Sequence, residues 1–146
     1  MEIKKSRVPI SNKDIEEVQR KIKFTLPEDY TCFLLHNNGG IPVRSEFAFT
    51  SRFGEESTSI VQFFLAINGD IRYDDLMTDF EYFKSTKRIK PKYLPIARDP
   101  FGNLICISLD GEDRGFVYFN DHEIQLFSDN MSLISKSFIE FLGMLK

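Results

Sequence analysis

The stretch from Leu94 to Phe119 constrains the fold more than any other part of the sequence, because three short apolar runs alternate there with turn-forming residues. The runs are Leu94–Arg98, Leu104–Leu109 and Phe116–Phe119. Pro, Gly, Asn and Asp cluster between them, which predicts a meander of three strands. The middle run is apolar at nearly every position, so we expect a central strand that is covered on both faces. Pro95 lacks an amide donor, which places the first run nearer an edge.

Four segments repeat apolar residues at the spacing of an amphipathic helix. Ser11 and Asp14 form a capping-box pattern at the start of the first segment. Pro27 suits the first helical position of the second, where no amide donor is needed. Asn38-Gly39-Gly40 ends that helix. The four predicted helices cover residues 12–23, 26–38, 73–83 and 135–145.

Three more strands are predicted, at residues 47–50, 60–67 and 122–127, with a polar loop over Ser51–Ser59. Strands joined by short turns, with helices near both ends of the chain, predict an α+β fold with a single antiparallel-rich sheet and helices packed on it. A length of 146 residues fits one domain, residues 1–146. We expect the helices at 26–38 and 135–145 to bury their apolar stripes against the sheet.

The charge of the chain is distributed unevenly. The formal net charge is only −3, but residues 70–83 carry five acids and one base, whereas residues 84–92 carry five bases and no acid. Such a mosaic differs from the uniformly basic surface of a nucleic-acid binder, and the basic segment has no aromatic residue on which a base could stack. We therefore expect no direct contact with nucleic acid.

The sequence shows no membrane or export signal. The basic N-terminus lacks the apolar run of a signal peptide. The most apolar run, residues 60–67, is too short to cross a bilayer. We therefore expect a cytoplasmic protein without a membrane partner.

Motifs for catalysis, metals and cofactors are also missing. The sequence contains no glycine-rich phosphate loop, no H-E-x-x-H, no C-x-x-C and no nucleophile elbow. Cys32, His36, Cys106 and His122 lack metal-ligand spacing. Both cysteines lie in apolar runs and are expected to be buried thiols, and His36 is expected to cap a helix end. No cofactor, metal site or catalytic residue is predicted.

Three segments, in this order, resemble the signatures of the SUKH superfamily of Smi/Knr-like proteins. Leu26–Gly40 is similar to L-P-x-x-Y-x-x-F-L-x-x-N-G-G, with one further residue before Asn-Gly-Gly, Leu94–Glu123 to the second signature, and Ser137–Leu142 to the C-terminal helix. The usual Trp near the last hairpin is absent, and Phe119 is expected to fill its space. The resemblance implies one sheet with helices packed on it, and a binding module instead of an enzyme.

The resemblance also implies a choice of partners. Bacterial members resemble immunity proteins that neutralise a cognate polymorphic toxin, often a nuclease, whereas fungal members resemble regulators linked to cell-wall synthesis. We expect a non-catalytic immunity protein, either a monomer or a weak homodimer. One alternative is a scaffold or regulator of an endogenous enzyme, such as one of cell-wall synthesis. Another is a small acid/base hydrolase that works through Asp110, Glu112, Asp113 or His122.

The outward face of the helix at residues 73–83 is the predicted partner-binding surface. Its acids would steer a basic toxin cleft, and a tyrosine among them would supply affinity. The competing interpretation is a solvated face whose charge is offset by residues 84–92. The predicted binding residues are Asp74, Asp75, Asp79, Glu81 and Tyr82, and the next candidates are Asp110–Asp113, Glu55 and Glu56.

Overall fold

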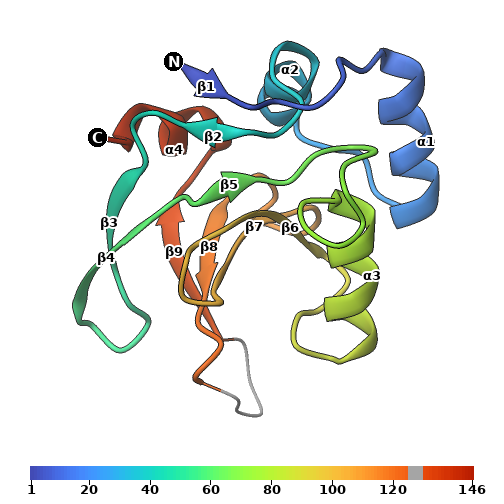
Figure 1. The fold of residues 1–146 in the computed structure, drawn as a ribbon. Coiled ribbons are helices and arrows are strands. Elements are labelled where there is room, and N and C mark those ends of the chain that lie inside the picture. Colours follow the sequence, from blue (N-terminus) through green and yellow to red (C-terminus); the bar gives the residue numbers. More distant parts are fainter. Residues whose placement is uncertain (125–129) are drawn as a thin grey trace.

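The computed structural model describes residues 1–124 and 130–146, and a five-stranded antiparallel sheet lies at its centre (Figure 1). Along the sheet the strands run in the order β5, β6, β7, β8 and β9, and every neighbouring pair is antiparallel. Helices and two short β-ribbons surround this sheet, which confirms the predicted α+β class. The five strands are Phe63–Phe64, Tyr93–Arg98, Leu104–Ser108, Val117–Asn120 and Met131–Ser135.

The remaining strands form two separate ribbons. β1 (Ile3–Lys4) pairs with β2 (Ile41–Pro42), and β3 (Glu46–Thr50) pairs with β4 (Glu56–Ile60). The helices are α1 (Asn12–Ile22), α2 (Glu28–His36), α3 (Leu76–Ser85) and α4 (Phe138–Met144).

The predicted meander is confirmed. β7 is the middle strand of the sheet and is buried at all five positions, as its continuous apolar sequence indicates. β6 is second from the edge, and its pairing with β7 shifts register between Pro95 and Ala97. The missing amide of proline is tolerated at such an irregularity.

The predicted start of α1 is confirmed, whereas α4 begins at Phe138, three residues later than predicted. The Asp14 carboxylate accepts a hydrogen bond of 2.9 Å from the Ser11 backbone N–H, and Lys23 ends α1 in the left-handed conformation. At α4, the Ser137 hydroxyl accepts a hydrogen bond of 3.1 Å from the Glu140 backbone N–H. These side chains satisfy amides that the first turn of a helix leaves unpaired.

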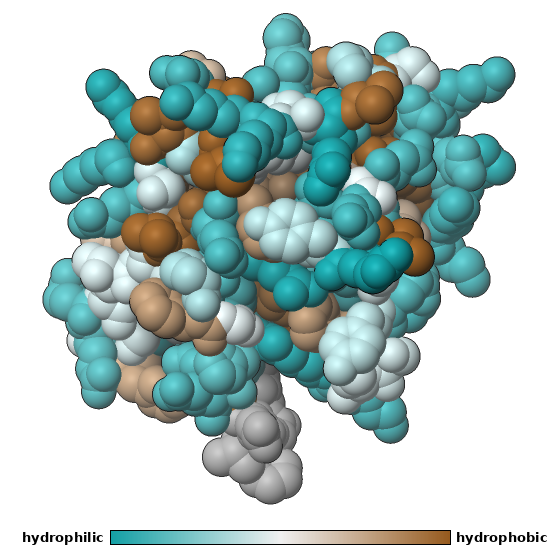
Figure 2. All heavy atoms as spheres, in the orientation of Figure 1, coloured by the Kyte–Doolittle hydropathy of each residue, from teal (hydrophilic) through white to brown (hydrophobic). Residues whose placement is uncertain are grey.

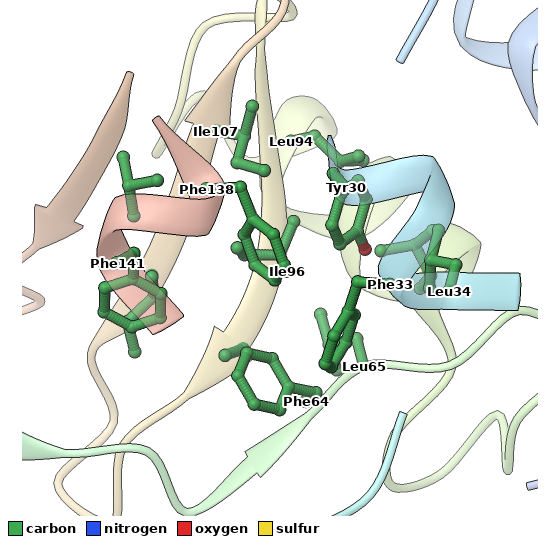
Figure 3. Packing of buried hydrophobic residues seen from close by; sticks show 14 of the residues in the cluster. Tyr30, Phe33, Leu34, Phe64, Leu65, Leu94, Ile96, Ile107, Phe138 and Phe141 are labelled. Carbon is green, nitrogen blue, oxygen red and sulfur yellow. The ribbon is translucent and has the colours of Figure 1, made fainter. Parts of the chain in front are cut away.

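Aromatic side chains from α2 and α4 meet over the sheet (Figure 3). The Phe138 ring lies 5.1 Å from Tyr30 and 5.0 Å from Phe33, and the Phe33 ring lies 4.9 Å from Phe64 of β5. Leu94 and other residues of the central strands complete the same core cluster. The apolar stripes of α2 and α4 therefore pack on the sheet as predicted.

The segment from residue 51 to residue 67 differs from the prediction. The expected loop Ser51–Ser59 contains most of β4, and the expected strand at 60–67 is divided, because Ile60 ends β4 and β5 covers only residues 63–64. The inward positions of β4 are serines, so apolar periodicity does not reveal the strand. Pairing with β3 forms it nevertheless, because strand propensity depends strongly on context.

The predicted strand at residues 122–127 is wrong over 122–124, which lie in a turn region, and residues 125–127 lie outside the described residues. The strand that pairs with β8 is β9, at residues 131–135, where no strand was predicted. Ser132 and Ser135 occupy its buried positions. Because serines and not apolar residues lie at the buried positions, the sequence of β9 shows no apolar periodicity that would indicate a strand.

The two cysteines differ in burial. Cys106 is buried in β7, and burial raises the pKa of its thiol to about 12. Cys32 is exposed on α2, so the prediction of a buried thiol there is wrong. The His36 Nδ1 atom lies 2.9 Å from the Cys32 carbonyl oxygen, consistent with the predicted role at the helix end.

Across residues 1–124 and 130–146, no helix is both long enough and apolar enough to span a bilayer.

Candidate functional site

The predicted acidic surface lies at the start of α3, where one of its residues caps the helix. α3 begins at Leu76, three residues later than expected. The Asp75 carboxylate accepts hydrogen bonds from the Thr78 backbone N–H at 3.0 Å and from the Gly69 backbone N–H at 3.0 Å. The Asp75 carboxylate therefore serves as the N-cap of α3.

Two more of the predicted binding residues form ion pairs inside the protein. Asp74 is only 4% exposed and pairs with Arg7 at 2.8 Å. Asp79 is 5% exposed and accepts two hydrogen bonds from Arg98, of 2.8 and 2.7 Å. The prediction that Asp74 lies on an exposed helical face is wrong, because this residue precedes the helix and the helical wheel does not apply to it. Asp79 faces β6, on which α3 packs.

Glu81 and Tyr82 are the members of the predicted set that the structure leaves exposed. Tyr82 is 58% exposed, and its ring centroid lies 5.0 Å from that of Phe83. Glu81 pairs with Lys84 at 3.3 Å, which agrees with the interpretation of a charge-balanced, solvated face. A partner contact by these two residues stays a prediction.

A groove of about 450 Å³ opens at the other side of the molecule, beside the β3–β4 hairpin. Its floor contains Phe49 and Phe119, whose ring centroids lie 4.7 Å apart. Phe53 and Phe101 also line the groove and are 63% and 69% exposed. The lower-left region of Figure 2, over this hairpin, shows light-brown and white residues between hydrophilic ones.

Asp99 holds the two sides of the groove together. Its Oδ2 atom accepts hydrogen bonds of 2.8 Å from the Ser59 hydroxyl of β4 and 2.8 Å from the Asn103 side-chain amide. Its Oδ1 atom accepts from the backbone N–H groups of Phe101 and Asn103, each at 2.9 Å. Asp99 thus fixes the β6–β7 turn against the hairpin and presents the Phe101 ring to solvent.

The segment after β8 adds polar residues to the lining of the groove. Asp121, His122 and Glu123 line it, and the His122 backbone N–H donates a hydrogen bond of 2.9 Å to the Asn103 side chain. Gly102 has a φ of 88°, and a Cβ atom there would meet the His122 ring at 3.3 Å. This glycine therefore allows the β6–β7 turn and the acidic segment to lie close together.

No sequence pattern predicted this groove, although Glu55 and Glu56, two of the next candidates for partner binding, lie on the same hairpin. The available signal was a single aromatic residue in each of two polar turns, Phe53 before Gly54 and Phe101 after Pro100. A turn exposes such a ring to solvent, and Trp, Tyr and Phe are enriched in protein interfaces.

The structure does not bring His122 to the candidate hydrolase acids Asp110, Glu112 and Asp113, which share the β7–β8 connection. Burial acts to raise the pKa of Asp113, but the hydrogen bonds that its carboxylate accepts from Lys92, Tyr118 and Ser108 together lower it. Asp113 precedes β8 and His122 follows it, so the two residues lie at opposite ends of this strand. Within the described ranges, no cluster of three or more His, Cys, Asp and Glu residues could hold a metal ion.

Comparison with curated proteins gives no match. The model of the SMI1/KNR4 family (SUKH-1) matches residues 9–144, nearly the whole chain and all four helices. Proteins of this family bind partner proteins, include immunity proteins and are generally non-catalytic. The chain therefore belongs to the SMI1/KNR4 family (SUKH-1).

Proposed function

We propose that this protein is an immunity protein that binds a cognate nuclease toxin through the groove beside the β3–β4 hairpin. The observation that carries the proposal is the pair of exposed rings, Phe53 and Phe101, which line one concave surface. Exposed aromatic residues that gather around a groove are typical of binding sites. Family membership supports a protein partner.

The charge of the groove supports a basic partner. Asp99, Asp121 and Glu123 line it, and none of its described lining residues is Lys or Arg. A nuclease needs a basic cleft because it binds phosphates. An acidic groove would accelerate encounter with such a cleft, while the rings would slow dissociation. Inhibition would then need no chemistry, only occupation of the nucleic-acid path.

Glu81 and Tyr82 form the alternative contact surface. They lie on α3, which Figure 1 draws on the opposite side of the five-stranded sheet from the β3–β4 hairpin. Tyrosine is a frequent hot-spot residue. Variants of the two surfaces therefore separate the two proposals.

The experiment is co-expression with the product of the neighbouring gene, followed by size-exclusion chromatography and a nuclease assay. We expect a 1:1 complex in which the nuclease is inactive. Failure to form a complex, or a complex that cleaves nucleic acid at the full rate, would overturn the immunity proposal. Capture of a cell-wall enzyme whose activity is modulated but not abolished would favour the scaffold alternative.

A further inference from the structure

We propose that the groove takes up an extended, basic segment of the partner, which adds as a strand to the free edge of β4. This inference rests on the proposed function, because it specifies how the partner is held. It depends on three observations: the hydrogen-bond register of β4, the absence of edge protection, and the chemistry of the groove beside it.

The register of the β3–β4 ribbon follows from its two ends. The Val61 backbone N–H donates to the Ser45 carbonyl at 2.8 Å, and the Ser51 backbone N–H donates to the Glu55 carbonyl at 2.7 Å. In an antiparallel pair, hydrogen-bonded and non-hydrogen-bonded positions alternate. The positions of β4 whose backbone groups point away from β3 are therefore Glu56, Thr58 and Ile60.

These outward groups form an open edge. In the part of the chain that the structure describes, β4 pairs with β3 and with no other strand. All three outward residues are exposed. An exposed edge of this kind presents donors and acceptors that can pair with another chain.

The edge also lacks the features that usually prevent such pairing. β4 pairs with β3 over five consecutive residues without a register shift. Its sequence, Glu-Ser-Thr-Ser-Ile, contains no Pro, and its one charged residue, Glu56, lies at the start of the strand and leaves residues 57–60 uncharged. Proteins normally protect exposed edges with prolines, charged residues (lysine above all) or bulges. An unprotected edge beside a groove indicates that the edge is used for binding.

The groove lies along this strand. Ser57, Thr58 and Ser59 line one side of it, and Phe101 lies in the β6–β7 turn that lines the other. The Ser59–Asp99 hydrogen bond joins the two sides. A strand paired with β4 would therefore place alternate side chains against the rings of the groove.

The occupant is identified by charge. Asp121 and Glu123 line the groove, and Glu56 is exposed at the start of β4, so Lys or Arg side chains would be attracted to this site. Strand addition gives affinity through the backbone and specificity through alternate side chains. A second copy of this chain fits less well, because its own hairpin would bring exposed Glu55 and Glu56 to an acidic groove.

The probe is a capped hexapeptide of alternating Val and Arg, added to the full-length protein. A hexapeptide of alternating Val and Glu is the matched control. We expect the Val/Arg peptide to shift the backbone amide resonances of residues 56, 58 and 60 and to slow their hydrogen exchange, and the Val/Glu peptide to do neither. No change at these amides with the Val/Arg peptide would overturn the inference.

Two variants at one position test the backbone contact. Thr58→Pro removes the outward N–H donor at an edge position where proline is tolerated, whereas Thr58→Ala keeps that donor. We expect Thr58→Pro to weaken peptide binding about fivefold or more, the effect of one lost backbone hydrogen bond, and Thr58→Ala to change it less than about twofold. If Thr58→Pro does not fold, Phe101→Ala replaces it, with an expected loss of at least about threefold.

The outcomes separate this inference from the proposed function. Toxin neutralisation without peptide-dependent changes at β4 would leave the immunity proposal intact and refute strand addition. Peptide binding at β4 without toxin neutralisation would support strand addition and refute the immunity proposal. A dimer that Thr58→Pro dissociates would make a second copy of the chain the occupant, and would overturn the assignment of a basic partner segment.

Discussion

Replacing Asp79 with alanine should destabilise the fold by about 2–3 kcal/mol, because its carboxylate forms an ion pair with Arg98 inside the protein. It accepts hydrogen bonds of 2.8 and 2.7 Å from Arg98, and hydrogen bonds to charged groups contribute about 1.5–3 kcal/mol. Breaking a fully buried pair costs about 3–5 kcal/mol. Arg98 is partly exposed and its guanidinium lies 5.7 Å from the Phe83 ring centroid, so water covers part of the unpaired charge and the lower range applies.

Urea denaturation of the wild type, Asp79→Ala, Arg98→Ala and the double variant measures the coupling between the two side chains. Glu81→Ala is the matched control, because Glu81 is exposed and its pair with Lys84 at 3.3 Å should change stability by less than about 0.5 kcal/mol. The slope of the transition should not change. A loss below about 1 kcal/mol for Asp79→Ala, or an equal loss for Glu81→Ala, would refute the assignment of Asp79 to the fold.

Three other predictions concern the core. Tyr30→Phe should leave the free energy of unfolding unchanged or raise it, by up to about 1–3 kcal/mol, because the buried Tyr30 hydroxyl has no hydrogen-bond partner within the described residues; a clear loss in chemical denaturation would contradict this. Phe141→Ala should lower it by about 3–5 kcal/mol, because the ring is fully buried, and a thermal melt close to that of the wild type would be inconsistent with this packing. Burial raises the pKa of Cys106 from about 9 to about 12, so its contribution to stability is present below pH 9 and declines as the pH rises towards 12. Cys106→Ala should therefore lose stability less steeply across that window, and parallel pH profiles for the two proteins would refute the linkage.

Local sequence patterns predicted the parts of the fold that local chemistry determines. The continuous apolar sequence of β7 indicated a strand covered on both faces, and the structure buries it completely. Ser11 and Asp14 predicted the start of α1 for a similar reason, because a capping box involves residues only three positions apart. These patterns need no knowledge of distant residues.

The predictions failed where distant segments determine the structure. β4 and β9 carry serines at their inward positions, so only pairing with β3 and β8 identifies them as strands. The sequence pattern predicted that Asp74 is available for a partner, but the fold places Arg7, 67 positions away in the chain, 2.8 Å from it. A helical wheel describes one helix and cannot show such a contact.

The groove is the strongest example of this limit. Its residues come from the β3–β4 hairpin, the β6–β7 turn, β8 and the segment after it, and β9. Phe53 and Phe101 are 48 positions apart in the chain, and neither follows an apolar period. The sequence therefore predicted a protein-binding module through family resemblance, but not the surface that we propose for binding.

Surface plasmon resonance of the toxin domain against four immobilised proteins tests the central claim most directly. The proteins are the wild type, Phe53→Ala, Phe101→Ala and Tyr82→Ala, and thermal melts establish that each is folded. All three rings are more than half exposed, so none of the changes should affect stability by more than about 0.5 kcal/mol.

We predict that each groove variant raises the dissociation rate by about 30-fold or more, as expected for a hot spot of about 2 kcal/mol, and that Tyr82→Ala binds like the wild type. Wild-type dissociation rates for both Phe53→Ala and Phe101→Ala, with fast dissociation for Tyr82→Ala, would contradict the account and place the interface on α3.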